Sequence, residues 1–199
     1  MRNLSSLHHP DDGIFIELLV LKLVVEKHAD SKRIFVAGFS SGGGMVADLA
    51  ARFQETIHAF AVVAAVGGLR PAKVTSPVSL LLFAGDADSV LLDAKRWAYI
   101  PDEAKLSWFG QLTLPTLSSE AKSWAVLDGC KRSIDKRVPW GRRTVWTGCM
   151  RGSHLEVYLV QDLGHEWPGD IVSRWNQDHA TLPPLDLSAL IWHFFISTQ

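Results

Sequence analysis

The sequence predicts an α/β fold built on a mostly parallel sheet. Three short apolar stretches, 34–37, 58–66 and 78–84, each run into a glycine and have the near-continuous hydrophobicity of strands buried on both faces. Segments with helical periodicity separate them, and strands that alternate with helices favour parallel pairing. With 199 residues, 47% of them hydrophobic, and no linker or repeat, the chain is expected to form one domain over 1–199.

The first helix is expected over 13–28. Asp11 and Asp12 supply the capping side chains and the negative charge that a helix N-terminus favours. Apolar residues cover most of the circumference of this helix, which predicts burial against the sheet. Further helices are expected at 45–53, 117–127 and 187–195.

The second half of the chain is less regular in its pattern. The segments 144–147 and 155–160 are expected to pair as strands across a turn at 150–153. The stretch 91–115 carries several aromatic residues without a clear period, so we expect an irregular excursion over one end of the sheet. These aromatic residues either line a substrate cleft or pack as an ordinary loop.

Charge and hydropathy narrow the range of partners. The formal net charge is −1, from 20 Lys and Arg against 21 Asp and Glu. A neutral chain is not attracted to a polyanion, so neither nucleic acid nor a membrane surface is an expected partner. The apolar stretch 14–25 contains Glu17 and Lys22 and is shorter than the ~20 residues that span a bilayer. The first twelve residues lack the apolar region of a secretory signal.

Cys130 and Cys149 are too few for a disulfide framework and lack the C-x-x-C spacing of a metal site. From the residues alone, two free thiols in a cytosolic protein and one disulfide both stay open.

The motif that carries chemistry is Gly38-Phe39-Ser40-Ser41-Gly42, which has the pattern G-x-S-x-G. It lies directly after a predicted buried strand and before a helix, which is typical of a nucleophile elbow that lifts Ser40 above the end of the sheet. We expect glycine at 38 and 42 because side chains there would collide with the neighbouring strand and helix. The helix N-terminus and the amide of Ser41 would stabilise an oxyanion. The alternative is a glycine-rich turn with a solvated serine.

A serine nucleophile needs a base and a group that orients the base. In this type of fold the acid follows a later strand, and Asp86 or Asp88 lies directly after the strand 78–84, with Asp93 a more distant candidate. The base comes last in the chain. His165 lies in a glycine-flanked and proline-containing loop after the last strand and is the favoured candidate, with His179 as the alternative.

These residues resemble the polyhydroxybutyrate depolymerase-like esterases, which include feruloyl and acetyl xylan esterases of the α/β-hydrolase fold. The resemblance covers nearly the whole chain. It is carried by the elbow segment 33–43, the acid loop 85–88, the histidine loop 164–169, and Trp124 with Asp128-Gly129-Cys130 and Cys149.

The resemblance implies several assignments. It selects Asp88 as the acid beside Ser40 and His165, a Cys130–Cys149 disulfide, and an extracellular location. It also implies that Trp167 flanks the acyl or aromatic part of a substrate, with packing beside Pro168 as the alternative. The substrate would be a small or polymeric ester, cleaved through an acyl-enzyme without a metal or organic cofactor.

The sequence departs from this family at its start. Nothing in residues 1–10 resembles the first strands of the family or the His-Gly loop that supplies a second oxyanion amide. We therefore expect an N-terminally incomplete sheet that leaves the edge of the strand 34–37 open to pairing with another chain. The alternatives to an active esterase are an impaired or inactive hydrolase remnant, and another serine hydrolase such as a peptidase or thioesterase.

Overall fold

The fold is described from a computed structural model, over residues 11–65, 75–92, 117–169 and 185–198. Two candidate residues of the sequence, Asp93 and His179, lie outside these ranges, as does nearly all of the predicted excursion at 91–115.

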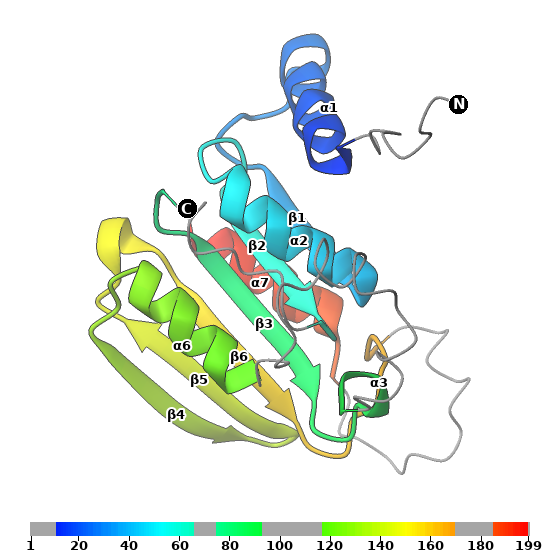
Figure 1. Cartoon of the computed structure of the whole chain (residues 1–199), viewed down its shortest axis with the longest axis vertical. Helices are drawn as coiled ribbons and strands as arrows, with labels where there is room; N and C mark the ends of the chain where they lie inside the picture. Colours follow the sequence, from blue (N-terminus) through cyan, green and yellow to red (C-terminus); the bar gives the residue numbers. More distant parts are fainter. Residues whose placement is uncertain (1–10, 66–74, 93–116, 170–184, 199) are drawn as a thin grey trace, which may run out of the picture.

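Within the described ranges, six strands form one mixed sheet in the order β1-β2-β3-β6-β5-β4 (Figure 1). The first four of these pair in parallel, as expected, and β5 and β4 extend the sheet in the antiparallel sense. The predicted pairing across the turn before β6 is confirmed, because β5 and β6 are antiparallel neighbours. The strands are β1 Phe35–Phe39, β2 Ala59–Val63, β3 Ser79–Gly85, β4 Arg132–Val138, β5 Gly141–Thr147 and β6 Leu155–Val160.

The sequence analysis did not predict β4, and the reason is its composition. Six of its seven residues are exposed, and β5 is its one neighbour among the strands that the structure describes. Such a strand has no buried face to leave a hydrophobic pattern in the sequence, so its pairing partner alone determines its structure.

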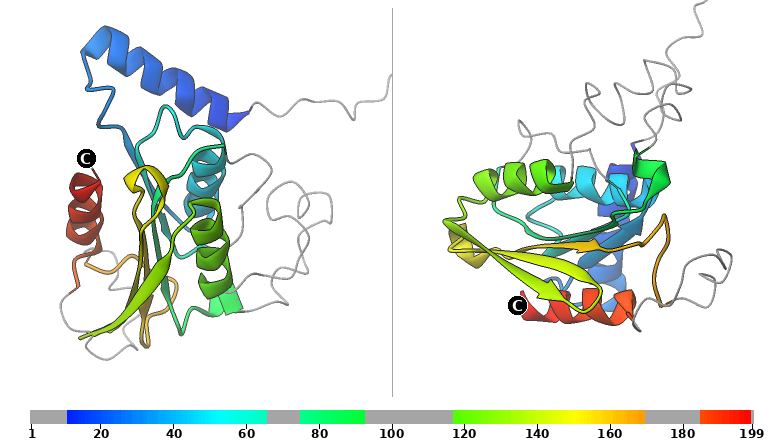
Figure 2. Two further views of the ribbon diagram at one scale, coloured as in Figure 1. Left: turned by 90° about the vertical axis from the view of Figure 1, so that its left-hand side faces the viewer. Right: turned by 90° about the horizontal axis from the view of Figure 1, so that it is seen from below.

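Helices cover both faces of the parallel part of the sheet. Figure 2 shows α2 and α6 on one face and α7 on the other. Each face has its own buried cluster, one around Trp124 and Phe60 and the other around Phe83 and Phe195. Burial on both sides explains why the predicted strands are almost continuously apolar. The helices are α1 Asp12–Lys27, α2 Ser41–Arg52, α3 Ser89–Leu92, α6 Leu117–Leu127 and α7 Leu187–Ser197.

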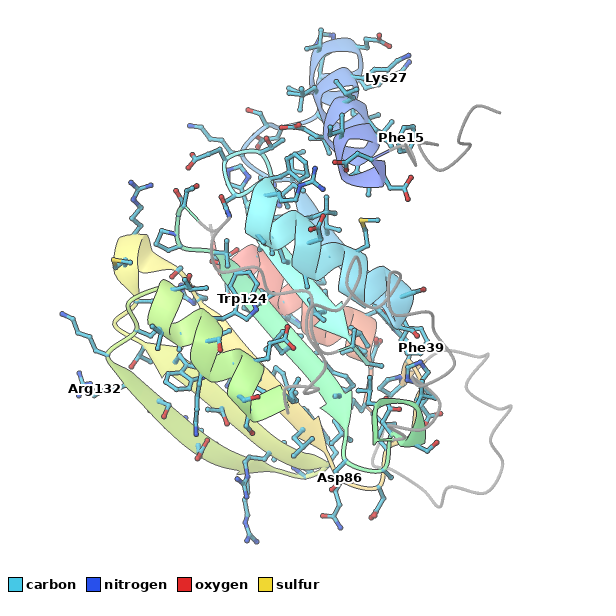
Figure 3. The ribbon with its side chains drawn as sticks, in the orientation of Figure 1. Phe15, Lys27, Phe39, Asp86, Trp124 and Arg132 are labelled. Carbon is cyan, nitrogen blue, oxygen red and sulfur yellow. A yellow bond between two sulfur atoms is a disulfide. The ribbon has the colours of Figure 1, made fainter. Side chains whose placement is uncertain are left out.

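The predicted burial of α1 is wrong. Most of its large apolar side chains are exposed, with Phe15 at 65% and Val25 at 73%, and Phe15 is labelled in Figure 3. Both faces of the sheet are occupied by other helices, and α1 lies against α2, where Arg52 forms a 2.6 Å ion pair with Asp11. This pair lowers the pKa of Asp11, which also caps the helix. No helix in the described ranges is long and apolar enough to cross a membrane.

The outer edge of β1 is free of any other strand that the structure describes. Among the described strands β1 pairs with β2 alone, and Ala37 in its middle is exposed. Unpaired backbone groups on such an edge are a template for another strand. Association through residues 34–37 is therefore still a prediction.

At the end of the sheet where β3 and β6 begin, a buried carboxyl group and a disulfide join several segments. Cys130 and Cys149 are bonded, as the resemblance implied, and link the segment after α6 to the one after β5. Asp128 is fully buried beside them and accepts hydrogen bonds from the Val78 amide at 3.1 Å and the Ser153 hydroxyl at 3.3 Å. Burial raises the pKa of Asp128 to about 6.

The raised pKa of Asp128 predicts a stability that falls with rising pH. The folded protein binds this proton more tightly than the unfolded chain, whose carboxyl has a pKa near 3.8, so the stabilisation is complete below pH 3.8 and is lost as the pH rises through about 6. Over that window the contribution of this group falls by roughly 1.4 kcal/mol per pH unit.

Asp128→Asn keeps an acceptor for Val78 and has no charge to desolvate. Urea unfolding from pH 4 to 7.5 is expected to show a shallower pH dependence in this variant and at least wild-type stability at pH 7. Mass spectrometry would verify that the new amide before Gly129 has not hydrolysed. Equal pH slopes for the two proteins would contradict this origin of the pH dependence.

The open edge of β1 predicts self-association that an edge charge weakens. Ala37→Lys places a charge in the middle of the strand, where it disfavours pairing with another chain. Sedimentation velocity over a concentration series is expected to show a shift towards monomer. The matched control is Val126→Lys, which adds the same charge at a 79% exposed position on α6. If both variants associate like the wild type, the β1 edge is not the contact.

Candidate active site

Ser40 lies at the sharp turn between β1 and α2. Its φ and ψ are 55° and −120°, and its amide donates a 2.9 Å hydrogen bond to the carbonyl of Val63 on the adjacent strand. A non-glycine residue with this backbone is strained by about 1–3 kcal/mol and persists only where the surroundings hold it. The turn has the strand-to-helix geometry expected of a nucleophile elbow, and α2 begins at Ser41, earlier than predicted.

The glycine requirement at this turn is only partly as predicted. A Cβ on Gly38 would collide with the carbonyl of Gly42, so glycine is needed there. A Cβ on Gly42 itself would meet no atom within 4 Å, and the prediction for that position is wrong. The helix is instead crowded at Gly43, where a Cβ would lie 2.9 Å from the carbonyl of Val63 and 2.8 Å from the Cβ of Ala65.

The two aspartates after β3 have different surroundings. Asp88 is fully buried, and its Oδ1 accepts hydrogen bonds from the amides of Val90 and Leu91 at 3.0 Å. Asp86 is exposed and turns away, so that its Oδ1 accepts the amide of Asp162 at 2.7 Å. The geometry therefore places Asp88, and not Asp86, in contact with the histidine loop's imidazole.

His165 connects the serine to the buried aspartate. Its Nδ1 lies 2.8 Å from Oδ2 of Asp88, and its Nε2 lies 2.8 Å from Oγ of Ser40. With the proton on Nδ1 donated to Asp88, Nε2 is free to accept the serine hydroxyl proton. The imidazole is largely buried, with 18% of the side chain exposed, so its contacts are protected from solvent.

Phe39 packs against the imidazole and was not predicted as a site residue. Its ring centroid lies 4.9 Å from that of His165, and Figure 3 labels it at the end of β1. The only sequence signal is its place at the first variable position of G-x-S-x-G, where many residue types fit. Its contact restricts the orientation of the ring that bridges Ser40 and Asp88.

Ser41 supplies an amide at the start of α2. The first N–H groups of a helix have no acceptor within the helix, so this amide is available to a negatively charged oxygen near Ser40. Within the described residues, no group of three or more His, Cys, Asp and Glu side chains is placed to hold a metal ion. The arrangement is chemically suited to acyl transfer from a substrate carbonyl to Ser40.

Trp167 is tied to α7. Its indole N–H donates to the Ser188 hydroxyl at 3.1 Å, and its half-buried ring packs against the cluster under that helix. These contacts hold the segment that follows His165, while a role in substrate binding stays a prediction.

Comparison with known proteins gives this site a context. No family model matches the chain. The chain is 25% identical over 174 residues to feruloyl esterase B of Piromyces equi. The sequence resembles a feruloyl esterase. The aligned region is 83% of this chain but only 31% of that protein, so this esterase-like chain spans about a third of its curated relative.

A solved structure has the same fold as this esterase-like chain. The acetyl xylan esterase of Aspergillus awamori superposes with a TM-score of 0.52 at 16% identity, covering 92% of this chain and 66% of the other. The predicted α/β fold and the resemblance to feruloyl and acetyl xylan esterases are thus confirmed. The expectation of missing N-terminal strands stays a prediction.

The crowding at the elbow predicts opposite effects for two neighbouring glycines. Gly38→Ala is expected to lower the unfolding free energy by several kcal/mol or prevent folding, because its methyl group would meet backbone that cannot move away. Gly42→Ala lies in open space within a helix and is expected to stabilise by about 0.5–1 kcal/mol. Thermal and urea unfolding would measure both variants, and equal losses at the two positions would contradict the crowding.

Proposed function

We propose that this chain is a serine carboxylic-ester hydrolase that works through an acyl-enzyme. The observation that carries the proposal is the bridge made by His165, with 2.8 Å to the hydroxyl of Ser40 and 2.8 Å to the buried carboxylate of Asp88. The names of its sequence relative and its structural neighbour, a feruloyl esterase and an acetyl xylan esterase, support ester hydrolysis over peptide or thioester hydrolysis.

In the first half-reaction, Oγ of Ser40 attacks the ester carbonyl carbon while Nε2 of His165 takes the hydroxyl proton. Asp88 keeps the imidazole oriented and stabilises the imidazolium that forms. The tetrahedral intermediate then expels the alcohol, which leaves with the proton from His165. In the second half-reaction, His165 deprotonates a water molecule, the water attacks the acyl carbon, and the carboxylic acid leaves as Ser40 recovers its proton.

The oxyanion of the intermediate needs donors that are in place before it forms. The amide of Ser41 is one, and it lies at the positive end of the twelve-residue helix α2. We assign Ser41 this role by its backbone, so its side chain can vary without loss of the donor.

The proposed substrates are esters of aromatic or short-chain acids, including esters carried on a polysaccharide. Trp167, two residues after His165, is proposed to border the acyl side of the site. The Cys130–Cys149 disulfide is typical of an oxidising compartment and supports an extracellular location.

Ser40→Ala and Asp88→Asn test the proposed mechanism, with Asp86→Asn as the matched control. Hydrolysis of p-nitrophenyl acetate and methyl ferulate is expected to lose nearly all catalysed rate in the first variant. The second is expected to lose a factor on the order of 10⁴ in kcat, because an amide favours the wrong histidine tautomer. Asp86→Asn keeps the acceptor for Asp162 and should retain near wild-type turnover.

The outcomes separate the alternatives. Full activity in Ser40→Ala would overturn the assignment of the nucleophile. A folded wild type that cleaves neither ester favours the inactive remnant, and cleavage of peptides or thioesters in preference to both esters favours another serine hydrolase.

A further inference from the structure

A groove with both polar and apolar lining lies beside the helix α6. It is near the edge of the sheet formed by β5 and β4, opposite the edge formed by β1. Its volume is about 250 Å³, and the walls come from α6 and from the hairpin of β4 and β5. Figure 1 shows α6 over β6 and β3, with β5 and β4 extending beyond it. The groove exists because the hairpin continues the sheet past the helix that covers it.

The floor and the walls of the groove differ in chemistry. Trp146, Val157 and Leu159 form an apolar floor, since they project from neighbouring strands on the side of the sheet that faces α6. Lys122 on α6 and Arg142 on β5 bring positive charge to opposite walls.

The two cations of the groove, Lys122 and Arg142, are not ion-paired within the part of the chain that the structure describes. Arg142 also lies directly opposite Arg137 on β4, and like charges in that position are destabilising. The carboxylate that the described residues place in the groove, on Asp135, accepts a 2.6 Å hydrogen bond from the hydroxyl of Thr144.

On the other face of the same hairpin, an arginine is neutralised by a carboxylate. There Arg143 donates two hydrogen bonds to the buried Glu156, at 3.0 and 2.7 Å. Glu156 of β6 therefore neutralises the arginine on one face of the hairpin, and Arg142 on the other face is left available to a ligand.

We infer that this groove binds a uronosyl residue of a polysaccharide. The volume of 250 Å³ lies just below that of pockets for drug-sized ligands and suits a single sugar ring. An apolar floor with an aromatic residue packs against the ring, Asp135 and Thr144 bond its hydroxyls, and Lys122 with Arg142 pairs with its carboxylate. The inference rests on the proposed function, since it places a second contact on the polymer that carries the ester.

The groove runs along the hairpin from Trp146, which pairs with Leu155 at the start of β6, to Arg142 near the end of the sheet where Ser40 lies. Arg142 pairs with Leu159, and Leu159 pairs with Ala84, which lies two residues before Asp86. Four strand spacings separate β5 from β1, so the groove is about 19 Å from Ser40 across the sheet. One sugar cannot occupy both sites, and a chain of several sugars can.

The test is equilibrium binding of the methyl glycoside of glucuronic acid to the wild-type chain. Calorimetry and ligand-observed NMR are expected to show binding that weakens at high salt, with methyl glucoside at least ten times weaker. The double variant Lys122→Gln/Arg142→Gln should lose at least tenfold in affinity. The matched control is Lys136→Gln, which removes a cation from the opposite face of β4 and should bind normally.

Three outcomes would overturn the inference. They are equal binding of the neutral and acidic glycosides, unchanged affinity in the double variant, or ferulate binding to the groove more tightly than the glucuronoside. A thermal unfolding midpoint equal to that of the wild type would show that the double variant is folded. Binding needs no turnover, so Ser40→Ala should bind the glycoside normally, and the inference and the proposed function can fail separately.

Discussion

The contact between the loops that follow β3 and β6 is the constraint on which the site depends. The amide of Asp86 donates to the carbonyl of Val160 at 2.9 Å, and the amide of Ala87 donates to that of Leu163 at 3.1 Å. Gly85 permits this approach, because a Cβ there would collide with the backbone of Leu163. With the two loops held together, the side chains of the buried acid and the histidine meet without further adjustment.

The turn at Ser40 positions the serine against the other nitrogen of the His165 imidazole. The strained backbone of Ser40 directs its hydroxyl to Nε2 of His165. The hydrogen bond that the Ser40 amide donates to the carbonyl of Val63 holds the strained residue on the sheet. Crowding at Gly38 and Gly43 leaves the turn little freedom to relax. The alignment of the three side chains is therefore a property of packed backbone, which is what preorganised acyl transfer requires.

Burial decided how much of this arrangement could be predicted from the sequence. The strands of the parallel sheet are covered on both faces, so their continuous hydrophobicity predicted them from the sequence. The glycines at their ends predicted the turns that follow. The exposed strand β4 carries no such pattern, and the apolar surface of α1 wrongly predicted a buried helix. At the site, the residues alone did not decide whether Asp86 or Asp88 contacts the histidine. That depends on which carboxylate is buried and which one accepts the hydrogen bond from the amide of Asp162.

The disulfide and the buried Asp128 lie at one end of the sheet, and the candidate active site lies at the other. At one end, the disulfide and the hydrogen bonds of Asp128 fasten α6 and the starts of β3 and β6 to one another. At the other end lie the strained Ser40 and the exposed turn at Asp86. Strain of about 1–3 kcal/mol persists only where the surrounding structure over-determines it, and at Ser40 the crowded backbone around Gly38 and Gly43 does so. The antiparallel hairpin of β4 and β5 adds charged surface at the margin of the sheet, and the disulfide closes it by joining the residues just before β4 and just after β5.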